Sequence, residues 1–520
     1  MRFQQSQGWL LSALLAEREA VERDEGFERY SQRLEKFERL KPRKEPASFQ
    51  GELRPYQRDA LGWFKFLAEL GFGGCLADDM GLGKTVQVLA LLESRRVRKL
   101  PKAATRQPSI VVAPRSLVFN WINEAARFAP KLKVVDYTGS GRQARLAETP
   151  DAHLLVTTYG TLRRDAPELA EKPFDYVVLD EATAIKNAGS LSAKAARLLR
   201  AEHRLALSGT PVENHLHELW SLFEFLNPGM LGRSSSFKKF AEEGAEVEDV
   251  GRIGHAIRPF FLRRTKTEVL TELPAKSEQV LTVELSKTNR ERYDELREHF
   301  RTELLGAAAR ADAADADEEL EVDKLNVLTA LLRLRQAACH PGLIDEDLRA
   351  EDSAKLDTLL PRLEELCAEG HKVLVFSQFT TMLGIVKERL TALKIPFEYL
   401  DGQTAKRQEC VERFQADPNI PVFLISLKAG GHGLNLTASD YVFILDPWWN
   451  PAVESQAIDR AHRMGQTRPV FAYRLIAKDT VEERVMEMQA KKRQLADDLF
   501  QGGTGVLKNL TRADLDALLS

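Results

Sequence analysis

A glycine-rich segment in the first fifth of the chain reads Ala77-Asp78-Asp79-Met80-Gly81-Leu82-Gly83-Lys84-Thr85. The short apolar run before it, residues 73–76, has the length of a strand, and the apolar run after it, residues 86–92, suits a helix. A strand, a tight turn and a helix in this order surround a phosphate group with backbone amides and a helix N-terminus. Lys84 can reach the β- and γ-phosphates, and the Thr85 hydroxyl can ligate Mg²⁺. The segment therefore predicts a phosphate loop in an α/β fold.

An acidic pair follows a second apolar run. Residues 176–179 are typical of a fully buried parallel strand, which places Asp180 and Glu181 at its carboxyl end, where open α/β sheets bind ligands. Asp180 is predicted to hold Mg²⁺ and Glu181 to polarise the attacking water. Many such pairs are only solvated caps, and a glycine-rich turn with a structural lysine is the alternative for the loop. Together the two segments favour nucleotide hydrolysis, although Asp78 replaces the first glycine of the general pattern.

Length and composition limit the class of protein. A chain of 520 residues predicts about three units, and 43% hydrophobic with 29% charged residues is typical of a soluble globular protein. No apolar run is long enough to span a membrane and no signal peptide opens the chain, so a cytosolic or nucleoid location is the default. The four scattered cysteines form no CxxC pair, which argues against disulfides and zinc. With a net charge of −3, any nucleic-acid surface must be local.

Strand-like and helical segments alternate twice along the chain, which predicts two parallel sheets covered by helices. The expected strands are residues 110–112, 134–137, 154–156, 176–179 and 204–207 in the first sheet, and 372–376, 397–400, 422–425, 441–445 and 471–475 in the second. The predicted organisation is an N-terminal helical segment and linker (1–46), a first lobe (47–270) with a helical protrusion at about 215–258, a helical insertion (271–350), a second lobe (351–480), and a C-terminal helix and tail (481–520). Within the insertion, residues 279–283 look like a strand.

Two further groups of residues point to the nucleotide. Gln57 opens a helix about 25 residues before the phosphate loop, and its amide can donate to and accept from adenine at once. On a predicted helix, Gln456, Arg460 and Arg463 fall at i, i+4 and i+7 and share one face. Two guanidinium groups on one face favour an anion between them, and a γ-phosphate in its transition state is such an anion. Surface arginines in salt bridges are the alternative.

The order of these segments resembles the Swi/Snf-type ATPases of helicase superfamily two. The resemblance covers residues 50 to about 490 and rests on residues 53–57, 78–85, 180–183, 207–211, 376–379, 426–436 and 456–466. Asp78 and the segments 446–451 and 461–466 distinguish this branch from DEAD-box RNA helicases. The alanine-, leucine- and arginine-rich sequence favours a bacterial member of the family, or the C-terminal ATPase core of one.

The resemblance implies two RecA-like lobes that face each other across an ATP cleft, with helical protrusions, and movement along double-stranded DNA without strand separation. It implies ATP contacts for Gln57 and for residues 79–85, metal binding for Thr85 and Asp180, and catalysis by Glu181, with Arg460 and Arg463 as arginine fingers and Gln456 near the γ-phosphate. It also implies DNA-backbone contacts for Ser116, Thr157, Thr158, Gln378, Ser426 and Lys428. Thr183 stands where the family more often has His or Gln.

The predicted activity is therefore ATP hydrolysis on duplex DNA, with ATP and Mg²⁺ as cofactors. Two alternatives stay open: a helicase that separates DNA or RNA strands, and an ATPase that remodels a protein partner such as RNA polymerase or another DNA-bound protein. We expect a monomeric core without a membrane partner, at the nucleoid in a bacterium or in the nucleus of a eukaryote. Adjacent Trp448 and Trp449 favour interdomain packing over stacking on bases.

Overall fold

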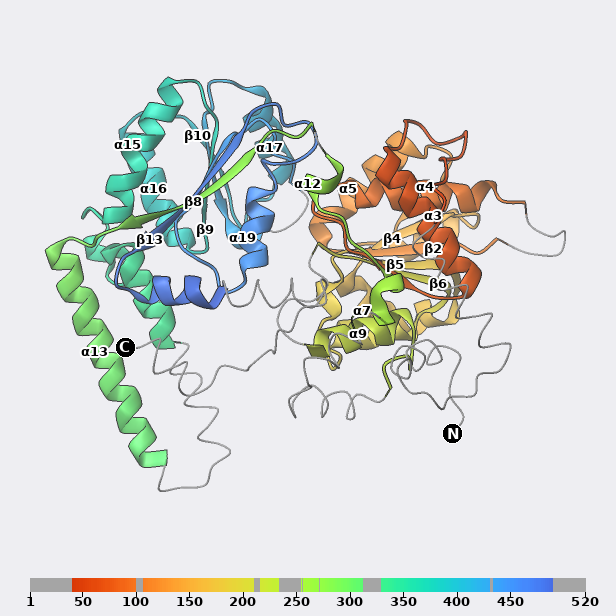
Figure 1. Ribbon diagram of the computed structural model, residues 1–520, viewed down its shortest axis with the longest axis horizontal. Coiled ribbons are helices and arrows are strands. Elements are labelled where there is room, and N and C mark those ends of the chain that lie inside the picture. Colours follow the sequence, from red (N-terminus) through yellow and green to blue (C-terminus); the bar gives the residue numbers. More distant parts are fainter. Residues whose placement is uncertain are drawn as a thin grey trace, which may run out of the picture. The chain divides into compact units, whose positions relative to one another are not determined.

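The computed structural model describes residues 40–99, 106–209, 216–232, 254, 256–270, 272–311, 329–430 and 434–489. The chain divides into two compact units, and the boundary between them falls between residues 271 and 272 (Figure 1). The predicted helices before residue 40, most of the predicted protrusion and the tail after residue 489 lie outside the described residues. None of the helices that the structure describes combines the length and apolar character of a membrane span.

The first unit contains a seven-stranded sheet whose order is β3-β4-β2-β5-β6-β1-β7, and all of its strand pairs are parallel. Its strands are β1 (Gly74–Leu76), β2 (Ser109–Ala113), β3 (Val134–Asp136), β4 (Leu154–Thr158), β5 (Pro173–Leu179), β6 (Arg200–Leu207) and β7 (Phe261–Leu262). Its helices are α3 (Pro55–Leu70), α4 (Lys84–Val97), α5 (Arg115–Phe128), α6 (Arg142–Glu148), α7 (Tyr159–Glu171), η2 (Ala182–Ile185), α8 (Leu191–Leu198), α9 (Leu216–Leu226), η3 (Arg258–Phe260) and α12 (Lys266–Val269).

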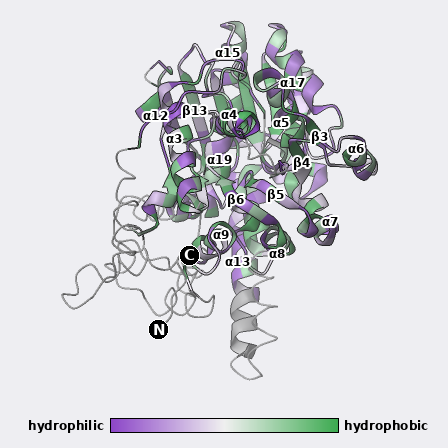
Figure 2. Ribbon diagram, turned by 90° about the vertical axis from the view of Figure 1, so that its right-hand side faces the viewer, coloured by the Kyte–Doolittle hydropathy of each residue, from purple (hydrophilic) through white to green (hydrophobic). Residues whose placement is uncertain are grey.

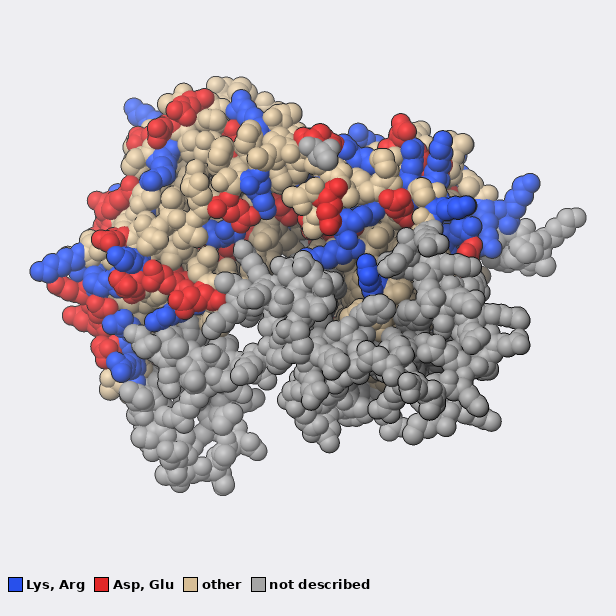
Figure 3. Space-filling model, viewed as in Figure 1, with Lys and Arg blue, Asp and Glu red and all other residues tan. Residues whose placement is uncertain are grey.

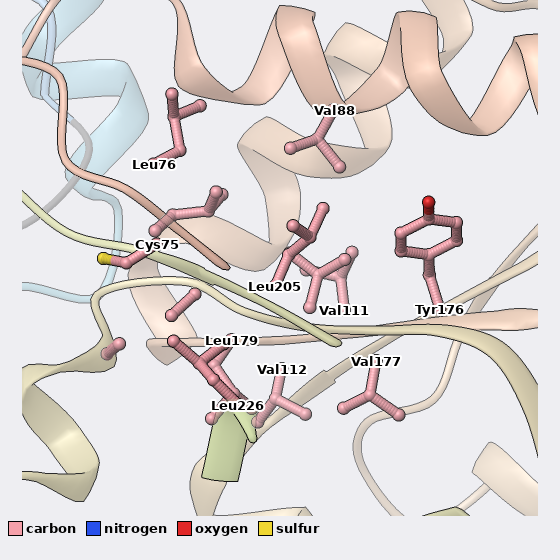
Figure 4. Packing of buried hydrophobic residues seen from close by; sticks show 14 of the residues in the cluster. Cys75, Leu76, Val88, Val111, Val112, Tyr176, Val177, Leu179, Leu205 and Leu226 are labelled. Atoms are coloured by element: carbon pink, nitrogen blue, oxygen red, sulfur yellow. The ribbon is translucent and has the colours of Figure 1, made fainter. Parts of the chain in front are cut away.

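The central strands of this sheet are apolar on both faces because helices cover both sides. Every residue of β1 and β2 is buried, as parallel strands in a two-sided sheet require. Figure 4 shows Val111 and Tyr176 on one side of the strands and Val112 and Val177 on the other. In Figure 2, the covering helices α7 and α8 carry both hydrophilic and hydrophobic residues, as expected of helices with one buried face.

The second unit contains a six-stranded sheet in the order β10-β11-β9-β12-β13-β8, again with parallel pairs only. Its strands are β8 (Lys276–Val283), β9 (Val373–Ser377), β10 (Phe397–Leu400), β11 (Val422–Ser426), β12 (Tyr441–Ile444) and β13 (Val470–Ala477). Its helices are α13 (Lys287–Ala311), η4 (Pro341–Leu343), η5 (Glu346–Leu348), α15 (Ala354–Ala368), α16 (Thr380–Ala392), α17 (Arg407–Ala416), α18 (Leu427–Gly430) and α19 (Pro451–Ile458), and residues 481–489 are also helical. The predicted fold class, two α/β lobes with parallel sheets, is confirmed.

Two strands lie outside the predicted pattern, and both are edge strands. β8 falls within the predicted helical insertion, where only residues 279–283 looked like a strand, and it pairs with β13 along its whole length. Most of its side chains are exposed, so it lacks the apolar run of a central strand. β7 has two residues and pairs with β1, the strand that precedes the phosphate loop. β7 is too short, and the first three residues of β8 are too polar, to be recognised before their partners are known.

Candidate functional site

The phosphate-loop segment forms the predicted strand, turn and helix. β1 ends at Leu76, and α4 begins at Lys84 with Gly83 as its N-cap. Gly81 and Gly83 have φ angles of 92° and 76°, a left-handed backbone that favours glycine. The turn therefore delivers the first amides of α4 to the carboxyl edge of the sheet, which is the arrangement that binds phosphate groups.

One carbonyl oxygen of this loop accepts hydrogen bonds from both of the helices beside it. Leu82 O accepts hydrogen bonds from the Tyr56 hydroxyl at 3.0 Å, from Gln57 Nε2 at 3.1 Å and from Gln87 Nε2 at 3.3 Å. Gln57 is buried, and its Oε1 accepts the backbone N–H of Arg54 at 3.0 Å. Its amide group thus supports the loop and the start of α3, and each end retains capacity for one more hydrogen bond.

The lysine and threonine of the loop lie at the first turn of α4. Lys84 Nζ donates to Asp78 O at 2.5 Å and to Asp79 O at 3.3 Å, so its ammonium group lies over the loop. Thr85 is partly exposed beside it. The Asp79 carboxylate accepts the Lys266 backbone N–H at 3.0 Å, and the Asp78 carboxylate is fully buried against Arg264. The residue that replaces glycine is therefore part of the loop's internal support.

Asp180 directly follows β5, and both of its carboxylate oxygens accept hydrogen bonds. Trp121 Nε1 donates to Oδ2 at 2.8 Å, and the Glu181 backbone N–H donates to Oδ1 at 2.9 Å. Burial raises the pKa of Asp180 to about 6, and the nearby Glu181 charge adds to this, while Trp121 and Lys84 act in the opposite direction. Carboxylate and hydroxyl oxygens are preferred Mg²⁺ ligands, so the donor set of Asp180 and Thr85 fits this ion.

Glu181 has the strained backbone that is common at functional sites. Its φ and ψ angles are 48° and 60°, a left-handed conformation that costs a non-glycine residue about 1–3 kcal/mol. The Tyr159 hydroxyl donates to the preceding carbonyl, Asp180 O, at 2.8 Å and helps to hold this turn. Thr183 follows in the short helix η2, where its hydroxyl group takes the place of the usual His or Gln side chain.

The predicted helix through Gln456, Arg460 and Arg463 is wrong in its length. α19 ends at Ile458, and Arg460 and Arg463 lie in the turns that follow, so the three side chains do not share a helix face. Arg460 is fully buried, whereas Arg463 is partly exposed and donates to Leu434 O at 2.9 Å.

Tertiary hydrogen bonds explain why this helix ends early. The Leu436 backbone N–H donates to Arg460 O at 3.1 Å. Gln466 Nε2 donates to Ala461 O at 3.0 Å and to Ser439 O at 2.8 Å. The bonds to Arg460 O and Ala461 O take carbonyl groups that a continuing helix would need for its own i to i+4 bonds.

The residues with implied DNA contacts differ in accessibility. Ser116 and Lys428 are exposed at the first turns of α5 and α18. Thr158 is partly buried and caps α7 by accepting the Thr161 backbone N–H at 3.1 Å. Thr157 is fully buried and donates its hydroxyl to Tyr137 O at 2.8 Å, and Ser426 is also buried. Only the accessible members of this group present a side chain to a ligand.

Gln378 lies after β9, where its backbone N–H donates to Asp446 Oδ2 at 3.2 Å.

Trp448 packs on the sheet of the second unit and Trp449 on its helices, with the Arg335 guanidinium 5.4 Å from the Trp449 ring centroid. Both tryptophans thus contribute to cores inside this unit. On the face shown in Figure 3, basic and acidic side chains are interspersed.

A separate acidic cluster lies at the amino ends of the strands. Asp175, Glu202 and His203 form the one group of potential metal ligands found among the described residues. Arg95 forms an ion pair with Asp175, and its positive charge balances part of the negative charge of this cluster. Burial and the neighbouring Arg95 charge lower the pKa of His203, which favours the neutral imidazole. We interpret the cluster as structural.

Sequence reasoning missed three residues that shape the site: Trp121, Tyr159 and Arg264. Trp121 and Tyr159 lie on helices that follow neighbouring strands, and their polar atoms are directed at Asp180. Arg264 lies in a segment far along the chain from the phosphate loop that it contacts. A buried aromatic residue with a polar tip is a general signal of such a contact, but it does not identify the partner.

A phosphate loop and a strand-end acidic pair in one parallel sheet, followed by a second parallel sheet, are typical of the class of helicase-like ATPases. A family model described as "SNF2-related domain" matches residues 56–343, and "Helicase conserved C-terminal domain" matches residues 354–465. The first model covers more than half of the chain. The chain therefore belongs to the SNF2-related family of ATP-dependent, helicase-like proteins.

Relatives from distant organisms match most of this chain in sequence. The "Putative ATP-dependent helicase/translocase YwqA" of Bacillus subtilis is 38% identical over 507 residues, which are 94% of this chain and 53% of that protein. The human "SWI/SNF-related matrix-associated actin-dependent regulator of chromatin subfamily A member 1" is 36% identical over 480 residues, or 87% of this chain and 44% of the relative. A solved "Sulfolobus solfataricus SWI2/SNF2 ATPase core in complex with dsDNA" is 33% identical with a TM-score of 0.44, covering 92% of this chain and 98% of that one. The chain spans about half the length of the curated relatives it matches.

Proposed function

We propose that the chain hydrolyses ATP when it binds double-stranded DNA and moves along the duplex without separating its strands. The observation that carries the ATPase part is the phosphate loop with Asp180 and Glu181 at the same edge of the sheet. The family supports ATP-dependent, helicase-like activity, and the name of the Bacillus relative includes both helicase and translocase. The choice of translocation over strand separation rests on the resemblance of the ordered segments.

In the proposed ATP complex, residues 79–85 surround the phosphates and the Lys84 ammonium exchanges its loop carbonyls for phosphate oxygens. Thr85 and Asp180 would hold Mg²⁺, which neutralises phosphate charge when it is bound. Glu181 orients and polarises the attacking water from its strained turn. Gln57 would use its remaining hydrogen-bonding capacity on adenine.

The second unit is proposed to supply positive charge to the reaction. We assign the role of arginine fingers to Arg460 and Arg463, with Gln456 beside the γ-phosphate. A fixed guanidinium stabilises the charge that develops on the transferred phosphoryl group. Arg460→Ala and Arg463→Ala are expected to keep ATP binding and lose turnover. Because Arg460 is buried, its variant should also lower stability, and by more than the Arg463 variant.

For DNA, we propose phosphate contacts by Ser116, Thr158, Gln378 and Lys428. Such contacts hold the backbone and carry little sequence information, so binding should tolerate any sequence and weaken steeply with salt. Thr157 and Ser426 are buried, and we leave their side chains out of the proposed contacts.

The decisive experiment measures ATP hydrolysis without nucleic acid and with duplex DNA, single-stranded DNA or RNA, with Lys84→Ala as the blank. The proposal predicts strong stimulation by duplex DNA, displacement of a triplex-forming strand, and no release of a strand from a forked duplex. Release of that strand would instead establish a helicase. If no nucleic acid stimulated hydrolysis, the proposal would be overturned. A protein partner, such as RNA polymerase or another DNA-bound protein, would then be favoured.

A further inference from the structure

The segment that leaves the first unit runs alongside the phosphate loop. β7 pairs with β1 in parallel, and the pairing continues past the end of β1, because the Ala77 backbone N–H donates to Leu262 O at 2.7 Å. Two residues later, the Asp79 backbone N–H donates to Arg264 O at 3.0 Å. Lys266 N then donates to the Asp79 carboxylate at 3.0 Å. Residues 262–266 therefore form one wall of the loop.

The side chain of Arg264 reaches across this wall to the aspartate that replaces the usual glycine. Its Nε donates to Asp78 Oδ1 at 2.9 Å, and its Nη2 donates both to Asp78 Oδ2 and to Gln87 Oε1, the latter at 3.0 Å. Nη1 donates to Tyr56 O, and the guanidinium lies 5.1 Å from the Tyr56 ring centroid. All three guanidinium nitrogens are thus engaged with the residues around the loop.

Gln87 transmits this contact to the rest of the loop. Its Nε2 donates to Asp78 Oδ2 at 3.2 Å and to Leu82 O at 3.3 Å, so one amide joins the two halves of the turn. The carbonyl of Asp78 is also the acceptor nearest to the Lys84 ammonium, at 2.5 Å. The position of Asp78 therefore affects both the peptide groups that face the phosphates and the lysine that binds them.

The geometry explains why an aspartate with an arginine partner can occupy this place. Asp78 is absent from the described residues with a left-handed backbone, so its φ does not require glycine. Its side chain is fully buried, and a buried carboxylate without a partner is strongly unfavourable. A two-point contact with a planar guanidinium meets this need, whereas the single ammonium of lysine does not reproduce it.

We propose that Arg264 is a positioning residue for nucleotide binding, which acts through Asp78 and Gln87 to hold the phosphate loop in the shape that receives ATP. The inference rests on the proposed ATP site and adds the segment that supports it. Arg264 touches no phosphate in this scheme. Its effect is on the affinity for nucleotide, because a loop that must be ordered during binding loses part of the binding energy.

The test compares Arg264→Lys and Asp78→Asn, singly and together, by titrating a fluorescent ATP analogue without DNA and by steady-state kinetics with saturating duplex. We expect the Kd and KM for nucleotide to rise about tenfold or more in each single variant, with a smaller change in kcat. The double variant should be no worse than the single ones, because both remove the same contact.

The matched control is Arg95→Lys. Arg95 lies near the other end of α4 and makes a similar two-point contact with Asp175 through Nε, at 2.9 Å, and Nη2. It should change the melting temperature without changing the nucleotide Kd. An equal Kd in Arg264→Lys and wild type would overturn the inference, while failure of the wild type to bind nucleotide would instead reject the ATP site itself.

A further variant covers the case in which Arg264→Lys does not fold. Gln87→Met preserves the ion pair and the volume of the side chain, but removes the amide that joins Asp78 to Leu82 O. It should still weaken nucleotide binding severalfold, since the loop loses two hydrogen bonds. An unchanged Kd in a folded Gln87→Met protein would contradict transmission through this residue.

Discussion

The carboxyl edges of the two sheets each carry a buried aspartate, but the surroundings of the two differ. Asp180 in the first unit lies beside Glu181 and near Lys84, and its carboxylate accepts from Trp121. Asp446 in the second unit accepts from the Ser377 hydroxyl and the Gln378 backbone N–H. Burial raises the pKa of both to about 6.

The two aspartates differ in the charged groups that surround them. Arg335 lies 4.0 Å from Asp446 at its nearest atoms, and Lys355 is fully buried nearby, where it contacts both carboxylate oxygens of Glu482 at 2.7 Å. The second unit thus neutralises its strand-end acid with its own cations. The first unit places a second acid beside Asp180 instead, an arrangement suited to a cation from outside. Internal cations therefore balance the strand-end acid of the second unit, whereas the same edge of the first unit carries two adjacent acids.

The largest expected effect tests the catalytic half of this comparison. Glu181→Gln should lower DNA-stimulated turnover by roughly 10²–10⁴-fold, because the amide no longer accepts a proton from water, while ATP and DNA binding remain. Steady-state hydrolysis and nucleotide titration measure the two properties separately. Turnover within a few-fold of wild type would show that Glu181 is not the base.

The next effect concerns the internal ion pair of the second unit. Lys355→Met leaves the buried Glu482 carboxylate without its cation and should lower the free energy of unfolding by about 3–5 kcal/mol. The double variant Lys355→Met, Glu482→Leu should recover most of this loss. Urea denaturation, followed by a probe in the second unit, measures both. If the single variant Lys355→Met were as stable as wild type, the Lys355–Glu482 ion pair would not be needed for the stability of the second unit.

The pH dependence of stability tests the raised pKa of Asp446. Its folded-state pKa of about 6 exceeds the ordinary value, so the folded protein holds this proton more tightly and its stability falls as pH rises from about 4 to 6. Asp446→Asn removes this dependence and keeps an acceptor for Ser377. The unfolding free energy of the variant, relative to wild type, should therefore rise by about 2 kcal/mol between pH 4.5 and pH 7.5. A constant difference across this range would contradict the raised pKa.

The smallest effect is on DNA binding by the second unit. Lys428→Ala should weaken duplex binding a few-fold for every sequence and reduce the salt dependence by about one phosphate contact. The exposed Lys406, which is paired with Glu409, provides the control variant Lys406→Ala. Fluorescence anisotropy at several salt concentrations distinguishes the two. Equal salt slopes for both variants would remove Lys428 from the proposed contacts.

Local sequence was sufficient for the parts of the molecule that depend on neighbouring residues. The phosphate loop, the central strands and the position of Asp180 and Glu181 at a strand end agree with the structure, because apolar runs and glycine-rich turns act over a few residues. The edge strand β7 was not recognised, and only residues 279–283 of β8 were, because the pairing of both strands depends on a partner far along the chain. The end of α19 was also missed, because it depends on a long-range bond from the Leu436 backbone and on a bond from the Gln466 side chain.

The sequence by itself determined the fold class and the family, since both follow from the order and spacing of short segments along the chain. Only the tertiary structure decided what supports the site: Trp121 on Asp180, and Arg264 on Asp78. Hydrogen bonds and ion pairs between distant residues depend on directions and distances of a few ångströms, which sequence order does not specify. The aspartate in place of glycine shows this most clearly, because its reason lies 186 residues away in Arg264.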